Sequence, residues 1–439
     1  MSDQPFVKLL RDAAPYVHAH HGRSFVVAFG GEAALSPHFA DLLYDIALLR
    51  SLGVRLVLVH GARPQIESRL EKADVDTQIS HGLRVTDSAA LACVKEGVGS
   101  LRLDIEALLS SGLAGTPMGG ARLDVAGGNL VTAKPVGVRN GIDHQYTGEV
   151  RSIDVEAVED LLSRGSVVLL SPIGYSKSGE TFNLRAEDVA VAVAEAINAD
   201  KLLFLHDGDS LQQRLDCNAQ LTLDEASRLA SQTPVVDAPA QELLRYAVQA
   251  CSRNIPRVHL VNHGEDGALL QELYSRDGAG TLVSRKAFDQ LRQAQVDDIV
   301  GIQNLIEPLQ ADGALIERGH ERLELELPNF LVMERDGLIT ACCALFPYNS
   351  TDDETAMGEL ACVAVHPDYR KQGRAEQLLD QVERQARGMG LRKLFALTTH
   401  TAHWFVEHHF NPAEVNDLPE RRRAHYSQQR NAKIFIKPL

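Results

Sequence analysis

The chain has 439 residues, a length at which two or three domains with full hydrophobic cores are expected. Its 44 Lys and Arg residues against 59 Asp and Glu residues give a formal net charge of −15. An acidic surface repels phosphate backbones and anionic lipid, so we expect small molecules or further copies of the chain as partners, and no nucleic acid or membrane. The 6 cysteines have no regular spacing, and we see neither a signal peptide nor a bilayer-spanning apolar run. We therefore expect reduced thiols, no metal site and a cytoplasmic location.

A first domain is predicted from short β-branched apolar runs that alternate with longer amphipathic segments. Strands that are buried on both faces of a parallel sheet have this continuous apolar character. The runs are 24–31, 55–61, 166–174, 201–207 and 257–262. Helices are expected between them, for example over 39–53 and 186–198. The pattern predicts an α/β fold with an open, mainly parallel sheet covered by helices on both faces, and ligands at the carboxyl ends of the strands.

The pattern changes near Gly280, and a smaller α+β domain is predicted after it. We expect a first domain over 1–283, a linker over 284–295 and a second domain over 296–439. The expected elements of the second domain are a helix at 298–309, strands at 329–335, 337–345 and 357–366, a helix at 373–388 and a strand at 393–399. Asp336-Gly337 predicts a tight hairpin between the first two strands, because Asp-Gly favours primed turns.

The most specific motif is GELACVAVHPDYRKQGRAEQLLDQV, from Gly358 to Val382. A strand ends at His366-Pro367, and Arg-x-x-Gly-x-Ala then opens a helix. Unpaired backbone N–H groups at such a helix start form a cradle for a pyrophosphate. This form resembles the coenzyme A motif of the GNAT acetyltransferase superfamily. The cradle would consist of Arg370, Lys371, Gln372, Gly373, Arg374 and Ala375.

The resemblance implies acetyl-CoA as a cosubstrate and no tightly bound cofactor. In that superfamily the pantetheine arm pairs with the motif strand, so Cys362, Val363 and Val365 would lie along it. A backbone N–H near Val363 would stabilise the oxyanion. A covalent role for Cys362 is disfavoured, because no activating group stands beside it in the sequence.

Two polar side chains on neighbouring strands are candidates for proton transfer. Glu359 could take a proton from the attacking amine, directly or through water, and Thr398 could donate one to the departing thiolate. Their alternatives are a solvated carboxylate at a strand end and ordinary β-propensity. Basic residues that could hold carboxylates by type are Arg318, Arg322 and Arg430, whereas the run Arg421–Arg423 is predicted to be a solvated face.

Three segments together resemble bacterial N-acetylglutamate synthases: GELACVAVHPDYR, LFALTTHTAHWFVEHHF and DLPERRRAHYSQQRNAK. The resemblance implies that L-glutamate attacks acetyl-CoA directly in a ternary complex, giving N-acetyl-L-glutamate and CoA in the first step of arginine biosynthesis. By position, Glu359 resembles the general base of this family and Thr398 its acid. Arg318 and Arg430 resemble the arginines that hold the carboxylates of glutamate. Ala432 stands where some relatives have Ser.

The first domain resembles the amino acid kinase family, most closely acetylglutamate kinase, through VVAFGG, LVHGARPQI, HGLRVTD and TFNLRAEDVA. Phosphoryl transfer requires cations that neutralise the charge on the transferred group. The resemblance places Ala28 and Glu242 where the kinases have lysines, and Glu187 at the carboxylate that organises them. Ala62 and Arg63 stand at glycines of the phosphate loop. We therefore interpret the domain as silent in phosphoryl transfer and as a sensor.

The segments 5–20 and 266–281 resemble the N-terminal helix and the arginine site of arginine-sensitive acetylglutamate kinases. The resemblance implies L-arginine as a feedback effector and a homo-oligomer, with a hexamer as the expected form. The candidate effector residues are Tyr16, Lys201, Glu272, Ser275, Gly278 and Gly280. Two alternatives remain open. One is an active acetylglutamate kinase, alone or combined with a synthase, and the other is a non-catalytic arginine-binding module.

Overall fold

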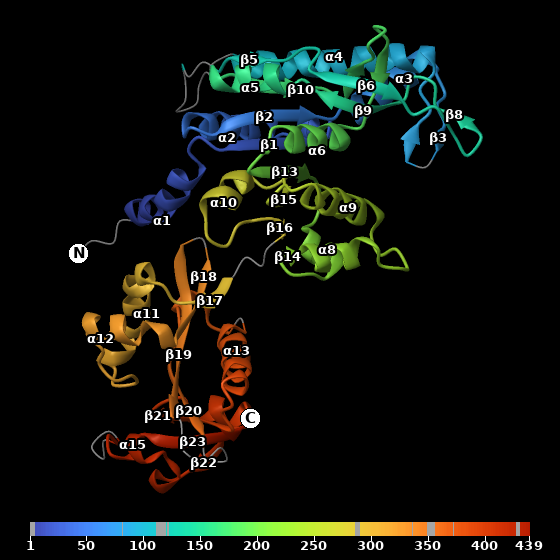
Figure 1. Ribbon diagram of the computed structural model, residues 1–439. Helices are drawn as coiled ribbons and strands as arrows, with labels where there is room; N and C mark the ends of the chain where they lie inside the picture. The colour runs from blue at the N-terminus through green and yellow to red at the C-terminus, as the bar shows by residue number, and fades with distance from the viewer. Residues whose placement is uncertain are drawn as a thin grey trace. The chain divides into compact units, whose positions relative to one another are not determined.

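The computed structural model describes residues 5–80, 82–110, 120, 123–285, 290–335, 337–348, 356–371, 373–426 and 431–439. The chain divides into two compact units between residues 287 and 288 (Figure 1). This division falls inside the segment 284–295 that was predicted to be a linker. Part of that segment is a strand, because β17 (Gln290–Gln293) pairs with β18 of the second unit.

The first unit is built on an eight-stranded sheet of order β14-β16-β15-β13-β1-β2-β10-β5. Its strands are β1 (Ser24–Phe29), β2 (Arg55–His60), β5 (Val125–Ala126), β10 (Val167–Leu170), β13 (Lys201–His206), β14 (Gln220–Thr222), β15 (Arg257–Asn262) and β16 (Thr281–Ser284). Among these strands every neighbouring pair is parallel except β15 and β16. The predicted mainly parallel α/β sheet is confirmed.

Helices cover both faces of this sheet, because alternate residues of each strand enter two separate cores. Val26 and Ala28 of β1 belong to one core, and Phe25 and Val27 belong to the other. The first core is closed by α5 (Val155–Ser163), α6 (Ala186–Ala196), α7 (Leu211–Leu215), α8 (Leu223–Ala230) and α9 (Ala238–Ser252). The second is closed by α2 (Phe39–Ser51), α3 (Arg63–Ala73), α4 (Ser88–Ser110) and α10 (Ala268–Tyr274). The N-terminal helix α1 spans Pro5–His20, as expected.

The apolar run 166–174 is not one strand, contrary to the prediction. β10 ends at Leu170, and β11 (Ile173–Tyr175) belongs to a separate four-stranded sheet of order β12-β11-β6-β9. Pro172 stands between them, and a proline has no N–H group with which to continue the ladder. The other strands of this sheet are β6 (Val131–Pro135), β9 (Gly148–Ile153) and β12 (Thr181–Asn183). Two short hairpins pair β3 (Ile79–Ser80) with β4 (Leu83–Arg84) and β7 (Val138–Arg139) with β8 (Ile142–Asp143).

The second unit has a seven-stranded sheet of order β17-β18-β19-β20-β21-β23-β22. Its further strands are β18 (Phe330–Arg335), β19 (Leu338–Tyr348), β20 (Met357–Val365), β21 (Lys393–Thr398), β22 (Asn411–Ala413) and β23 (Lys433–Pro438). β18 and β19 form the predicted antiparallel hairpin, with Gly337 at a φ of 79°; Asp336 lies outside the described residues. β20 and β21 are parallel.

Helices also cover both faces of the second sheet. One core is closed by α11 (Ile299–Ala311) and α12 (His320–Glu326), and the other by α13 (Arg374–Gly388) and α14 (Ala402–Glu407). The short helix α15 spans Glu420–Arg423. All 6 cysteines are free thiols. Within the described ranges, we find no helix with the length and apolar character needed to cross a membrane.

Candidate active site

The parallel strands β20 and β21 pair only at their beginnings. The paired residues are Met357–Glu359 on β20 and Lys393–Phe395 on β21, although the strands continue to Val365 and Thr398. Beyond the paired residues the two strands part, and the edge of β20 that faces β21 has no strand partner among the described residues. An extended ligand can add itself to such an open edge by backbone hydrogen bonds.

A β-bulge interrupts the open part of β20. Cys362 and Val363 together oppose the single residue Cys343 of β19, and Cys362 has a φ of 53°. Ala361 and Cys362 consequently both contact the core under α11, whereas Val363 contacts the core under α13. A bulge re-aims the backbone and side chains around it, here in the middle of the open edge.

The thiol of Cys362 is buried at this bulge, with a residue exposure of 3%. Burial raises the pKa of the Cys362 thiol to about 11. Since the thiolate is the nucleophilic form of cysteine, this thiol is almost wholly protonated and unreactive at neutral pH.

The loop after β20 leads into an uncapped helix N-terminus. Lys371 and Gly373 both have positive φ, at 61° and 75°, and α13 begins at Arg374. No side chain of the described residues caps this end, and the first intrahelical donor is the N–H of Gln377, which donates to the carbonyl of Gly373. The three preceding N–H groups therefore form an anion site together with the helix dipole. Gln372 lies outside the described residues.

The side chain of Arg374 does not face this cradle as a surface cation. It is 4% exposed, and its Cζ lies 4.4 Å from the centroid of the buried Tyr369 ring. Arg374 therefore packs inside the loop, and its backbone N–H is the group that can serve a ligand. The prediction that Arg374 contributes to the cradle is thus limited to its main chain.

Glu359 is buried where the pairing of β20 and β21 ends, and it accepts three hydrogen bonds. Arg422 donates from Nε to Oε2 at 2.7 Å and from Nη2 to Oε1 at 3.1 Å. The Tyr348 hydroxyl donates to Oε2 at 3.1 Å. Burial and the adjacent Glu359 carboxylate raise the pKa of Tyr348 to about 12, so its hydroxyl remains a donor.

The prediction that Arg421–Arg423 is a solvated face is wrong for its central residue. Arg422 is buried, while Arg421 and Arg423 are exposed. One turn of helix presents three consecutive side chains in three directions, so only one of them reaches the sheet. Three identical residues in a row give no sequence signal that would single out Arg422.

Thr398 and Glu359 lie on opposite faces of the sheet. Ala396 contacts the core under α13, so strand alternation places Thr398 on that face. Leu360 contacts the same core, which places Glu359 on the face of α11. The Thr398 hydroxyl lies 2.9 Å from the hydroxyl of Thr401. It also accepts a hydrogen bond from the backbone N–H of Thr401 at 3.1 Å.

The candidate substrate arginine Arg318 is already paired within the unit. Its Nε donates to Glu326 Oε2 at 2.9 Å, and Arg322 donates to the other oxygen of Glu326 at 2.7 Å. The Arg318 side chain is buried and the Arg322 side chain is half-exposed. An incoming carboxylate at Arg318 must share this guanidinium with Glu326 or replace it. Arg430 lies outside the described residues.

The predicted effector residues of the first unit converge on a buried chain of polar groups. Glu272 on α10 lies with Oε1 2.5 Å from His259 Nδ1, and its Oε2 accepts the N–H groups of Ala279 at 2.8 Å and Gly280 at 2.7 Å. Lys201 Nζ lies 3.3 Å from His259 Nε2. His259 was not among the predicted residues, and a single His in an apolar strand gives little signal.

The charges along this chain follow from burial. Burial and the neighbouring Lys201 lower the pKa of His259, which is therefore a neutral imidazole that donates to Glu272 and accepts from Lys201. Burial alone would raise the pKa of Glu272, but the hydrogen bonds from His259 and from two backbone N–H groups outweigh it and lower the pKa. Lys201 and Glu272 are thus opposite charges joined through one imidazole.

Of the remaining predicted effector residues, Gly278 and Gly280 adjoin Glu272, Ser275 binds Gly278, and Tyr16 lies beside His20. Ser275 accepts the N–H of Gly278 at 3.2 Å, and a Cβ atom on Gly278 would stand 2.4 Å from Glu272 Oε2. A Cβ atom on Gly280 would stand 2.4 Å from a strand carbonyl oxygen. Tyr16 of α1 lies beside His20, with ring centroids 6.3 Å apart, and His20 Nε2 lies 2.8 Å from a carbonyl oxygen of α10.

A cleft of about 450 Å³ in the first unit is lined by Glu242 and by three arginines, Arg139, Arg185 and Arg245. Glu242 lines it and forms an ion pair with Arg185, whose guanidinium lies 5.2 Å from the ring centroid of Tyr246. Burial raises the pKa of the adjacent Glu187. Among the described residues that line the cleft there is no lysine, and Ala28 is buried in β1.

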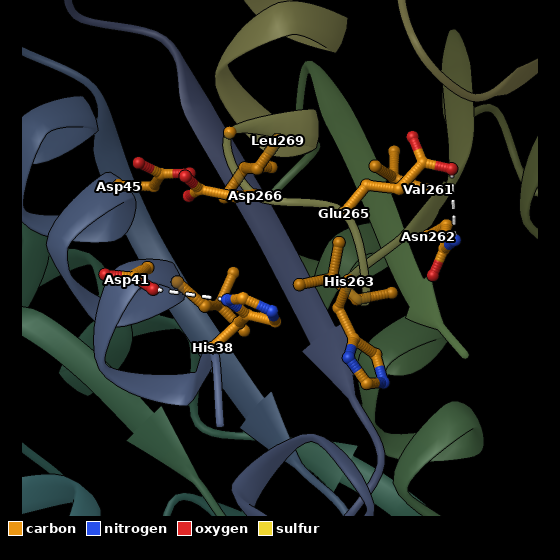
Figure 2. Close-up of a pocket in the computed structure, with 12 residues that line it drawn as sticks. His38, Asp41, Asp45, Val261, Asn262, His263, Glu265, Asp266 and Leu269 are labelled. Carbon is orange, nitrogen blue, oxygen red and sulfur yellow. Dashed lines mark hydrogen bonds and ion pairs between the residues drawn. The ribbon is translucent and has the colours of Figure 1, made fainter. Parts of the chain in front are cut away.

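A smaller cavity of about 10 Å³ lies between α2 and the loop before α10 (Figure 2). Its ionisable lining residues are His38, Asp41, Asp45, His263, Glu265 and Asp266. Asp45 is 6% exposed and has no hydrogen-bond partner within the described part of the chain. Figure 2 shows the side chains of Asp45 and Asp266 pointing toward one another. Burial, followed by the charges of Asp266 and Asp41, raises the pKa of Asp45 to about 7.

Residues 23–262 match the amino acid kinase family, and residues 302–410 match the acetyltransferase (GNAT) family. The chain is therefore a GNAT acetyltransferase fused to an amino-acid-kinase-like domain. Amino-acid acetyltransferases from Azotobacter vinelandii and Pseudomonas putida are 49% and 48% identical to it, each over 99% of both chains. The chain belongs to the amino-acid acetyltransferase family.

The same architecture is seen in crystal structures of N-acetylglutamate synthase from Neisseria gonorrhoeae. Its complex with coenzyme A and L-arginine matches this chain with a TM-score of 0.88 and 36% identity over 99% of both chains. Its complex with coenzyme A and N-acetyl-glutamate matches with a TM-score of 0.61 over the same share. The predicted family and two-domain fold are confirmed.

The buried Asp45 predicts a pH-dependent stability that can be measured. Its pKa is about 7 in the folded protein against 3.8 as the ordinary value, so folding becomes less favourable as the pH rises from 4 to 7. Asp45→Asn removes this penalty. In urea unfolding, we expect it to stabilise the first unit by about 2 kcal/mol more at pH 8 than at pH 5. Asp104→Asn, at an exposed position on α4, is the control, and an equal effect of Asp45→Asn at both pH values would contradict the assignment.

Proposed function

We propose that the protein transfers the acetyl group of acetyl-CoA to the amine of L-glutamate, giving N-acetyl-L-glutamate and CoA. The observation that carries this proposal is the parting of β20 and β21 after Glu359, with an uncapped helix N-terminus at the end of the opening. The relatives from Neisseria gonorrhoeae, solved with coenzyme A and with N-acetyl-glutamate, support the same assignment.

Acetyl-CoA would bind to backbone groups more than to side chains. Its pantetheine arm adds to the open edge of β20, where Cys362, Val363 and Val365 lie. Its pyrophosphate sits at the start of α13, where unpaired N–H groups and the helix dipole favour an anion. The amide dipoles thus supply a local positive potential in a chain whose net charge is negative.

The reaction would use the two faces of the sheet separately. The amine of glutamate approaches on the face of Glu359, which takes its proton directly or through one water as the C–N bond forms. A backbone N–H at the bulge near Val363 stabilises the oxyanion. When the C–S bond breaks, Thr398 donates a proton to the thiolate from the opposite face. Because the Cys362 thiol is protonated at neutral pH, direct attack is favoured over an acyl-enzyme.

Glutamate is held by charge pairing to its carboxylates in this proposal. Arg318 is one binding group, and its pairing with Glu326 keeps the guanidinium oriented when no substrate is bound. Arg430 is the other expected group. In this proposal the first unit contributes no phosphoryl transfer, because Ala28 and Glu242 stand where the resemblance to the kinases implies lysines.

We propose further that L-arginine binds the first unit at Glu272 and Lys201 and regulates the transferase by feedback. Glu272 is an anion that a guanidinium can pair with, and Lys201 is the cation of the same buried chain. Gly278 and Gly280 adjoin Glu272, Ser275 binds Gly278, and Tyr16, beside His20, is the further group of the proposed site. The relative solved with L-arginine supports the choice of ligand. We keep the homo-oligomer as part of this proposal.

The first test is a CoA-release assay with glutamate. Glu359→Gln keeps the shape of the side chain but removes the base, so we expect kcat to fall by about 10²-fold or more while CoA still binds. Glu407→Gln, exposed on α14, is the matched control. Full activity of Glu359→Gln would exclude the proposed base. ATP-dependent phosphorylation of N-acetylglutamate would restore the kinase alternative, and no glutamate-dependent CoA release would favour the binding module.

A second test concerns the effector. Saturating L-arginine should raise the melting temperature of the wild-type protein and change its activity, since a ligand at about 100 times its Kd stabilises by about 2.7 kcal/mol. Glu272→Gln should abolish both responses, whereas Asp277→Asn, exposed in the same loop, should keep them. An arginine response that survives in Glu272→Gln would move the site elsewhere.

A further inference from the structure

The two carboxylate oxygens of Glu359 are used unequally. Oε2 accepts from Arg422 Nε at 2.7 Å and from the Tyr348 hydroxyl at 3.1 Å, whereas Oε1 accepts only from Arg422 Nη2 at 3.1 Å among the described residues. A carboxylate oxygen has about two lone-pair sites. The contacts therefore fill Oε2 and leave one acceptor position on Oε1.

We propose that Arg422 is a positioning residue for the proton transfer: together with Tyr348 it fixes the Glu359 carboxylate so that Oε1 receives the proton. This inference rests on the proposed function, in which Glu359 is the base. The proton moves from the ammonium of glutamate, directly or through one water, to the unoccupied lone pair of Oε1. No bond from Arg422 to the substrate is required.

The geometry of the pair gives Arg422 control over orientation. A guanidinium that binds a carboxylate through two parallel N–H groups fixes the plane of the carboxylate as well as its position. Both side chains are about one-tenth exposed, at 10% for Arg422 and 11% for Glu359, so water competes weakly for these bonds. Arg422 is held in turn, because its Nη1 donates to the carbonyl oxygen of His425 at 3.3 Å.

Three separate elements thus define the orientation of Glu359. The carboxylate stands on β20, the guanidinium on α15 and the hydroxyl on β19. Within the described residues, the charge of Glu326 on α12 also acts on Tyr348, and the charges of Arg318, Glu326 and Arg322 act on the neighbouring Cys362. The alternative is an ion pair that only attaches α15 to the sheet. Such a pair would affect stability without affecting the step in which the proton moves.

The experiment compares Arg422→Lys and Arg422→Met with Arg421→Met, which removes the exposed neighbour. Arg422→Lys keeps the charge but cannot form the two parallel bonds, so we expect kcat to fall about tenfold with the KM for acetyl-CoA unchanged. Arg422→Met should lower kcat by about 10²-fold, again with the KM for acetyl-CoA unchanged, because nothing then fixes the plane of the Glu359 carboxylate. Tyr348→Phe should give a smaller loss of kcat.

The result that would overturn the inference is a pair of Arg422 variants with lowered melting temperatures whose kcat matches that of Arg421→Met. In that case the ion pair is structural only. Failure of the proposed function is distinguishable, because the wild-type protein would then release no CoA in response to glutamate, whereas an active Glu359→Gln would exclude only Glu359 as the base. If Glu359→Gln is inactive while the Arg422 variants are fully active, the role of Arg422 is excluded and the proposed base is retained.

Discussion

The shortness of the pairing between β20 and β21 is the constraint on which the candidate site depends. Parallel strands that continued in register would fill the sheet and leave no backbone groups for a ligand. Here the ladder stops at Glu359, and the bulge at Cys362 bends β20 beyond that point. The proposed base, the proposed acid and the uncapped helix start lie at the edges of one opening: Glu359 where it begins, Thr398 at the end of β21 and α13 beyond the end of β20.

The formal net charge of the chain is −15, yet several arginines are buried close to this opening. The buried arginines are paired with carboxylates, as Arg422 is with Glu359 and Arg318 with Glu326. Arg374 packs on an aromatic ring inside the loop. Free positive potential for a pyrophosphate is left to the backbone N–H groups of α13, whose dipoles need no counterion. In the proposed site, the side-chain cations orient other groups and the backbone amides bind the ligand.

Much of the fold could be predicted because its strands are apolar on both faces and its helices are amphipathic. The strand, turn and helix start of the proposed coenzyme A cradle could be predicted as well, because the three follow one another within a short segment. Contacts between residues far apart in the sequence could not. Arg422 binds Glu359 across a separation of 63 residues, and its two neighbours in the sequence are also arginines, so the sequence does not distinguish it from them. Asp45 is a different case, since it stands among the apolar positions of α2 and the pattern could have marked it as buried.

The central claim is that CoA binds as an added strand on the open edge of β20. Hydrogen–deuterium exchange with and without CoA tests it most directly, because the amides on that edge have no strand partner among the described residues. The account predicts that CoA slows exchange over residues 361–365 and in the first turn of α13, while β18, which lies on the other side of β19, keeps its rate. Binding of CoA without protection of residues 361–365 would contradict the account.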